Sequence, residues 1–160
     1  MPVLYLDPDG DGVVDNWGGT YTSVDEGVRY PSAGFTGSIS TSNTYVDIEF
    51  TVPDIAVSGT ATSVELWYSF SNEPCDGANL KWNGAWKTAV SPSVFVSGVW
   101  YKHTWTITDS LASITDNGIR LTSGDFGDDT GVYSTYLKVS YTETAAAGNP
   151  WYHHAQQGGM

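Results

Sequence analysis

Cysteine, basic residues and long hydrophobic runs are all scarce in this sequence, and each shortage excludes a class of protein. Cys75 is the only cysteine in 160 residues, which excludes an intramolecular disulfide and a cysteine-based zinc site. No stretch approaches the roughly 18 consecutive apolar residues that a membrane-spanning helix needs. The first ten residues, MPVLYLDPDG, lack the basic and apolar regions of a signal peptide, so we expect synthesis in the cytoplasm.

The shortage of basic residues decides which partners are excluded. Six lysines and arginines stand against eighteen acidic residues, which gives a formal net charge of −12. Such a charge repels nucleic-acid phosphate and anionic membrane surfaces, so we expect neither as a partner. The acidic residues are scattered through the chain, which is typical of a solvated surface. Proteins and sugars remain as the expected partners.

The short motifs that carry catalysis are also missing. The sequence has no Gly-x-Ser-x-Gly, no His-Glu-x-x-His and no phosphate-binding glycine loop. Carboxylate pairs at a glycosidase spacing would occur by chance among eighteen acids, so they indicate nothing. His103 lies in an alternating apolar segment, and the adjacent His153 and His154 would point opposite ways on an extended chain. We therefore expect a protein that is not an enzyme and requires no cofactor.

Period-two alternation of apolar and polar residues is abundant. It occurs in YVDIEFTV, SVELWYSF, VWYKHTWTI and YSTYLKVSY, and it is typical of strands with one buried face. Several such strands predict an all-β protein, an antiparallel β-sandwich. The residues expected to be buried are Val46, Ile48, Phe50, Val52, Val64, Leu66, Tyr68, Phe70, Val99, Tyr101, His103, Trp105, Ile107, Tyr133, Thr135, Leu137, Val139 and Tyr141.

The segment KWNGAWK predicts a tight hairpin, because Asn-Gly between two strand-like runs favours a two-residue turn. This turn would pair Trp82 with Ala85 and Lys81 with Trp86. The two tryptophans would then point to opposite faces, and Lys81 would lie across the ring of Trp86.

The segment TDSLASITDNG predicts one short helical turn near residues 109–116. Ser110 or the preceding Asp109 can cap it, and Leu111 and Ile114 would share one side. The Asn-Gly pair at 117–118 would end the turn.

The opening segment LYLDPDGDGVVDNWGG is the strongest sign of a metal site. Its aspartates match the first, third, fifth and ninth positions of an EF-hand loop, but the twelfth position is Gly18 instead of the bidentate glutamate. The carboxylates could hold a calcium ion, with Asp25 or Glu26 completing the shell. Asp-Pro and Asp-Gly pairs also form ordinary turns, so both interpretations stay open. The candidate calcium ligands are Asp7, Asp9, Asp11 and Asp15.

Aromatic residues are plentiful, with seven tryptophans and ten tyrosines. Side chains alternate between inward and outward positions along a strand, and this strand parity directs Trp67, Trp100 and Tyr136 outward. One tryptophan of the hairpin also points outward, and we expect it to be Trp86. Exposed rings can stack on sugars, and they are equally common at protein interfaces. The sequence leaves both roles open.

The order of these segments resembles a recurrent family of small β-sandwich structural proteins of tailed bacteriophages. The resemblance rests on LYLDPDGDGVVDNW, TYTSVDEGVRYPSAG, GVWYKHTWTITDSLASITDNGIRL and STYLKVSYTE, and it covers most of residues 3–143. It implies a jelly-roll-like sandwich without catalytic residues. It also implies a capsid decoration or cement protein that binds and stabilises the outer capsid surface, or a part of a tail or head fibre.

A decoration role implies a location on the virion, at the capsid surface, after synthesis in the host. The implied partners are the major capsid protein and further copies of this chain, as a trimer on a threefold axis. The alternative function is a carbohydrate-binding, lectin-like module of a fibre, with Trp67, Trp86 and Trp100 as ligand-binding residues.

The expected organisation is a β-sandwich domain over residues 1–143 and a C-terminal arm over residues 144–160. The arm differs in composition from the domain, and Gly148 and Pro150 would interrupt a helix. Apolar side chains near both termini would dock on capsid neighbours or on other copies. These expected interface residues are Val3, Tyr5, Trp151 and Tyr152.

Overall fold

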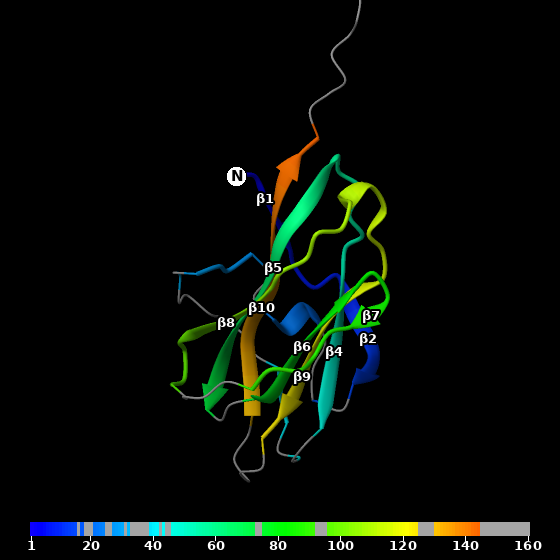
Figure 1. Cartoon of the computed structure of the whole chain (residues 1–160). Helices are drawn as coiled ribbons and strands as arrows, with labels where there is room; N and C mark the ends of the chain where they lie inside the picture. Colours follow the sequence, from blue (N-terminus) through cyan, green and yellow to red (C-terminus); the bar gives the residue numbers. More distant parts are fainter. Residues whose placement is uncertain are drawn as a thin grey trace, which may run out of the picture.

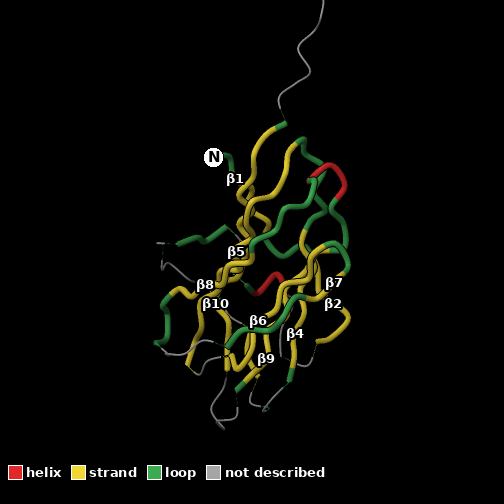
Figure 2. Tube along the Cα trace, viewed as in Figure 1, coloured by secondary structure: helices red, strands yellow, loops and turns green. Residues whose placement is uncertain are grey.

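The chain folds into two antiparallel sheets packed face to face, as the computed structural model shows (Figures 1 and 2). Strands make up almost all of the regular structure of the described residues, and two short 3-10 turns, η1 (Tyr21–Ser23) and η2 (Leu111–Ser113), complete it. The structure describes residues 1–15, 17, 21–24, 27–30, 32, 39–41, 43, 46–72, 75–91, 96–124 and 130–144.

Sheet A contains five strands in the order β1-β10-β5-β8, with β3 also paired to β10. These strands are β1 (Val3–Leu6), β3 (Ile39–Thr41), β5 (Gly59–Asn72), β8 (Trp100–Trp105) and β10 (Thr130–Glu143).

Sheet B also contains five strands, in the order β2-β4-β9-β6-β7. These strands are β2 (Gly10–Asp15), β4 (Asp47–Val52), β6 (Cys75–Trp82), β7 (Ala85–Trp86) and β9 (Asn117–Ser123).

The path of the chain gives the sandwich its topology. After β4 in sheet B, the chain crosses to β5 in sheet A, returns to β6 and β7, crosses to β8, returns to β9 and ends at β10. The last strand, β10, lies between the first strand β1 and the long strand β5. This nested alternation is the strand order of a jelly roll. The predicted all-β, jelly-roll-like sandwich is confirmed.

The core lies between the sheets and follows the predicted alternation closely. Ile48, Phe50 and Val52 of β4 are buried, and so is every second residue of β5 from Val64 to Phe70. Seven of the positions expected to be buried are not fully buried. Five of them are half-buried, namely Val46, Tyr101, His103, Trp105 and Tyr141. The other two differ for identifiable reasons. Val99 precedes β8 and is 44% exposed. Tyr133 falls where the register of β10 shifts, between Val132 and Ser134, so the alternation is interrupted there.

The predicted hairpin is confirmed in register and in orientation. Lys81 pairs with Trp86, and Trp82 pairs with Ala85. Asn83 and Gly84 have φ angles of 50° and 79°, the left-handed values that this two-residue turn requires. Trp82 points into the core, and the Lys81 ammonium lies 5.9 Å from the ring centroid of Trp86.

The predicted helical turn is also present, as η2, and Ser110 caps it by accepting a hydrogen bond from the Ala112 N–H. Leu111 and Ile114 are both buried, as expected. The end of the turn differs from the prediction. Ile114 is already extended and Asp116 has a φ of 52°, so the Asn-Gly pair at 117–118 begins β9 instead of ending the turn.

The ends of the predicted domain can be placed only in part. Strand β10 ends at Glu143, while residues 145–160, with Trp151 and Tyr152, lie outside the described residues. The division into a domain and an arm therefore stays a prediction. In the described part of the chain, no helix is long and apolar enough to cross a bilayer.

Candidate functional site

The outer face of sheet A carries several of the aromatic residues singled out from the sequence. The strand register places Tyr5 of β1 beside Lys138 of β10, and Tyr136 of β10 beside Trp67 of β5. Further along the same face, Trp67 lies opposite Lys102 of β8. Five rings gather here and are called the aromatic face below. They are Tyr5, Tyr30, Trp67, Trp100 and Tyr136.

Tyr136 forms the base of the aromatic face. Its ring lies parallel to that of Trp67, with centroids 6.1 Å apart, and meets Trp100 and Tyr5 edge to face at 5.5 and 5.9 Å. Tyr136 is only 2% exposed, although it points away from the sandwich core, and burial raises its pKa to about 12. The other rings therefore form a layer above and around it.

Tyr30 is the outermost ring of this layer. It stacks on Trp67 with a centroid distance of 5.0 Å and is itself 59% exposed. Tyr5 is 46% exposed at the other side of the face. A ligand on this surface would meet Tyr30 and Tyr5 first, while Trp67 supports Tyr30 from below.

Charged side chains hold the rings in place. The Arg29 guanidinium lies 4.8 Å from the ring centroid of Tyr5 and 5.2 Å from that of Tyr136, and it pairs with Asp7 at 2.5 Å. The Lys102 ammonium lies 5.2 Å from the centroid of Trp67. Such cation–π contacts fix the orientation of both partners.

Glu65 connects the charges on this face. It accepts hydrogen bonds from the Trp67 indole at 2.9 Å, Lys138 at 3.1 Å and Lys102 at 3.3 Å. Burial by itself raises the pKa of Glu65, but the three hydrogen bonds and the charge of Lys138 together outweigh it, so the pKa lies below its usual value. Glu65 therefore stays ionised and keeps both lysines on the face.

Tyr30 was not predicted from the sequence. Residues 27–30 belong to a loop that packs on sheet A, and the Trp100 indole donates a hydrogen bond to the Ser32 carbonyl at 2.6 Å. A loop has no period-two alternation, so parity could not assign Tyr30 to a face. A tyrosine directly before Pro31 marks only an extended or turn position.

The predicted ligand-binding tryptophans do not form one site. Trp67 and Trp100 share the aromatic face, and Val3 and Tyr5 of the predicted interface lie on the same side of sheet A. Trp86 lies on sheet B, where the Arg120 guanidinium is 4.2 Å from its ring centroid. Parity gave the correct outward direction for each tryptophan but could not tell which sheet it belonged to.

The aspartate-rich segment is partly a strand, because Gly10, Asp11 and Asp15 of β2 pair with β4, although the register shifts between Asp11 and Asp15. Asp7 pairs with Arg29. Asp9 accepts a hydrogen bond from the Thr51 hydroxyl, and Asp11 accepts one from the Tyr21 N–H.

The described aspartates thus have separate partners. Within the described residues, no three His, Cys, Asp or Glu side chains gather as metal ligands. The Asp15 side chain and the distant candidates Asp25 and Glu26 lie outside what the structure describes. The calcium site therefore stays a prediction.

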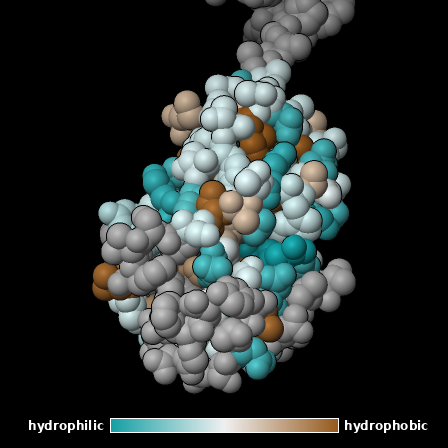
Figure 3. Space-filling view, turned by 60° about the horizontal axis from the view of Figure 1, so that its bottom comes forward, coloured by the Kyte–Doolittle hydropathy of each residue, from teal (hydrophilic) through white to brown (hydrophobic). Residues whose placement is uncertain are grey.

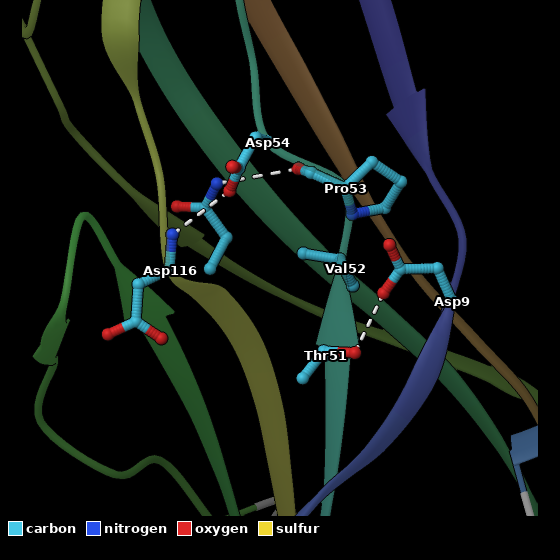
Figure 4. Close-up of a pocket in the computed structure, with 7 residues that line it drawn as sticks. Asp9, Thr51, Val52, Pro53, Asp54 and Asp116 are labelled. Atoms are coloured by element: carbon cyan, nitrogen blue, oxygen red, sulfur yellow. Dashed lines mark hydrogen bonds between the residues drawn. The ribbon is translucent and has the colours of Figure 1, made fainter.

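A cleft of about 350 Å³ lies at one end of sheet B (Figure 4). Asp9 stands on one side of it, and Asp54 and Asp116 stand on the other. The Asp54 carboxylate accepts a hydrogen bond from the Asp116 N–H at 3.1 Å. The remaining lining residues are Thr51, Val52, Pro53 and Asn117.

A smaller hollow of about 80 Å³ adjoins this cleft on the outer face of sheet B. The two share Thr51, Asp116 and Asn117, and Trp86 lines the hollow. Figure 3 shows that the apolar side chains visible from its side of the molecule appear as separate spots among hydrophilic ones.

Polar groups at the edge of the core form no open site. The Tyr68 hydroxyl and His103 Nε2 are 2.7 Å apart, and burial lowers the pKa of His103 and raises that of Tyr68. Cys75 begins β6 and is fully buried, which raises the pKa of its thiol. These groups contribute to the core.

The fold and this surface define a small jelly-roll β-sandwich with an aromatic outer face on one sheet. No protein-family model matches the sequence, and no curated protein matches it significantly.

One similar structure is the CBM36-1 domain of a multidomain xylanase from the hindgut metagenome of Trinervitermes trinervoides. It has 17% identity and a TM-score of 0.46, over 89% of this chain and all of that domain. A family 35 carbohydrate-binding module from an environmental isolate has 16% identity and a TM-score of 0.46, over 89% and 98% of the two chains. The Podospora anserina GH26-CBM35 β-(1,4)-mannanase has 12% identity and a TM-score of 0.44, over 91% of this chain and 29% of that one.

These similarities are too remote to assign a family, a ligand or an activity. The structures named above are carbohydrate-binding modules and an enzyme that contains one. They lend no support to a phage origin.

Proposed function

We propose that the protein is a non-catalytic glycan-binding module whose ligand lies across the aromatic face of sheet A. One observation carries the proposal. Rings from four strands and one loop form a single layer, and the two outermost, Tyr5 and Tyr30, remain 46% and 59% exposed. An exposed ring layer of this kind is typical of a binding surface.

The polar groups on the same face favour a sugar as the ligand. A sugar ring offers C–H groups that pack on aromatic rings, and its hydroxyls need donors and acceptors nearby. Glu65, Lys102 and Lys138 supply both beside Trp67. Because their mutual hydrogen bonds already hold them, little side-chain freedom is lost on binding.

Protein attachment is the second candidate for the same surface. Val3 and Tyr5 are 39% and 46% exposed on β1, whose only partner among the described strands is β10. An edge strand with exposed apolar side chains suits docking on another protein. In this second proposal the protein decorates an assembled capsid as a trimer, binding the major capsid protein and residing on the virion.

Retention on immobilised polysaccharides and on bare capsid-like particles distinguishes the two proposals. We expect retention on polysaccharide, and Tyr30→Ala should weaken it by about 1–2 kcal/mol, roughly 5- to 30-fold, because one exposed ring is lost. Tyr30→Phe keeps the ring and should bind like the wild-type protein. An unchanged melting temperature confirms that the variants fold.

Two results would refute glycan binding at this face. The first is polysaccharide retention that is equal in the Tyr30→Ala and wild-type proteins. The second is saturable binding to capsid-like particles while every polysaccharide fails to retain the protein, which would establish the attachment role.

A further inference from the structure

A concave surface on sheet B consists of the cleft together with the hollow beside it. The strand register aligns Thr51, Gly118, Lys81 and Trp86 in one row across β4, β9, β6 and β7. Gly118 has no side chain in the middle of this row, so the floor is open there. A Cβ at this position would also come within 2.8 Å of the Phe50 carbonyl oxygen, which shows how closely the backbone of β4 approaches the floor.

Fixed polar groups and one ring surround this floor. Lys81 pairs with Asp116 at 2.6 Å, and the Thr51 hydroxyl donates to Asp9 at 2.7 Å. Trp86 forms the far wall, with Arg120 packed against its ring. A ligand here would meet an aromatic surface at one end and hydroxyl, carboxylate and ammonium groups along the rest.

The net negative charge of the cleft limits which kinds of ligand can bind there. Lys81 compensates Asp116, but the ion pairs found among the described residues include neither Asp9 nor Asp54. An anionic ligand would therefore be repelled. A purely apolar ligand would also be disfavoured. It would displace water from the polar lining groups without replacing their hydrogen bonds, which costs free energy.

We propose that this cleft is a second ligand site, which binds a short, uncharged oligosaccharide. Its volume of about 350 Å³ lies within the roughly 300–1,000 Å³ of small-ligand pockets. Sugar hydroxyls match the polar walls, and a sugar ring can pack on Trp86. The site lies on the sheet opposite the aromatic face, so this inference does not depend on the function proposed for that face.

The test is an NMR titration of isotope-labelled protein with a neutral tetrasaccharide panel and a uronate tetrasaccharide. We expect the neutral sugars to shift the Trp86 indole signal and the backbone amides of Thr51 and Asn117. Thr51→Val, which keeps the shape of the side chain but removes the hydroxyl, should weaken this binding about 2- to 10-fold. Trp86→Ala should weaken it at least as much, and Tyr30→Ala should leave it unchanged.

Several results would overturn the site. One is a titration in which no neutral tetrasaccharide shifts the Trp86, Thr51 and Asn117 signals. Another is binding that Thr51→Val and Trp86→Ala leave unchanged while both variants keep the wild-type spectrum elsewhere. Stronger binding of the uronate at the same signals would contradict the charge argument.

Discussion

The ion pair between Glu49 and Arg120 gives the sharpest test of the packing described above. Glu49 points outward from sheet B, yet it is only 7% exposed. The neighbouring strand β2 approaches it closely, since a Cβ on Gly12 would come within 2.3 Å of the Glu49 Cβ. Arg120 lies opposite Glu49 in the register and donates to its Oε1 from Nε at 2.7 Å and also from Nη2.

Replacing Arg120 with leucine should leave this covered carboxylate without its charged partner. Breaking a fully buried pair from one side costs about 3–5 kcal/mol. The Arg120 side chain is 29% exposed, so water can partly replace it. The lost contact with Trp86 adds about 0.5–1 kcal/mol. We therefore expect Arg120→Leu to lower the free energy of unfolding by about 2–4 kcal/mol, a large share of the roughly 5–15 kcal/mol of a typical domain.

Urea denaturation of three variants tests this reasoning. Lys81→Met is the matched control on the same face, because its partner Asp116 is 60% exposed and such a pair contributes about 1 kcal/mol or less. The double variant Glu49→Leu/Arg120→Leu should regain part of the loss, since no unpaired charge remains. A loss for Arg120→Leu no larger than that for Lys81→Met, at an unchanged urea dependence, would refute the stabilising role of the Glu49–Arg120 pair.

Four further predictions follow from individual residues. Burial lowers the pKa of His103 below 6.5, so the free energy of unfolding should fall as the pH drops below about 6.5, and His103→Gln should flatten that dependence in urea midpoints. Leu66→Ala should cost about 2–5 kcal/mol by the same assay, because Leu66 is fully buried; a loss below 1 kcal/mol would contradict its place in the core. Gly84→Ala should cost about 1–2 kcal/mol at its φ of 79°, whereas an unchanged midpoint would mean a different turn. If the predicted calcium site exists, calcium should raise the melting temperature relative to chelator and Asp9→Asn should abolish the rise; an unchanged melting temperature would mean that the separate partners of Asp7, Asp9 and Asp11 stand in place of a metal.

The strands could be predicted because burial on one face imposes a period of two. Ile48, Phe50 and Val52 alternate with polar residues for this reason. The hairpin could be predicted as well, because few residue pairs besides Asn83-Gly84 tolerate the required φ angles. Parity fails wherever the register shifts, as it does at Tyr133.

The candidate site could be predicted only in part. Parity directs Trp67, Trp86 and Trp100 outward, but strand order decides which sheet carries each, and strand order depends on contacts far apart in the chain. Tyr30 could not be predicted because it lies in a loop. The aspartate spacing that indicates a calcium loop also occurs in a strand, where residues two apart share a face, so the spacing alone cannot separate the two.

The outer face of sheet A carries aromatic rings that the packing of the core does not require. Folding needs apolar residues only at the inward positions, and any polar residue would satisfy the outward ones. Sheet A instead carries rings outward and arranges Arg29, Lys102 and Glu65 around them. Exposing Tyr30 adds no core contact and leaves a large ring in water, at a cost in free energy. Because the fold gains nothing from this exposure, the aromatic face is better explained by a ligand that covers it.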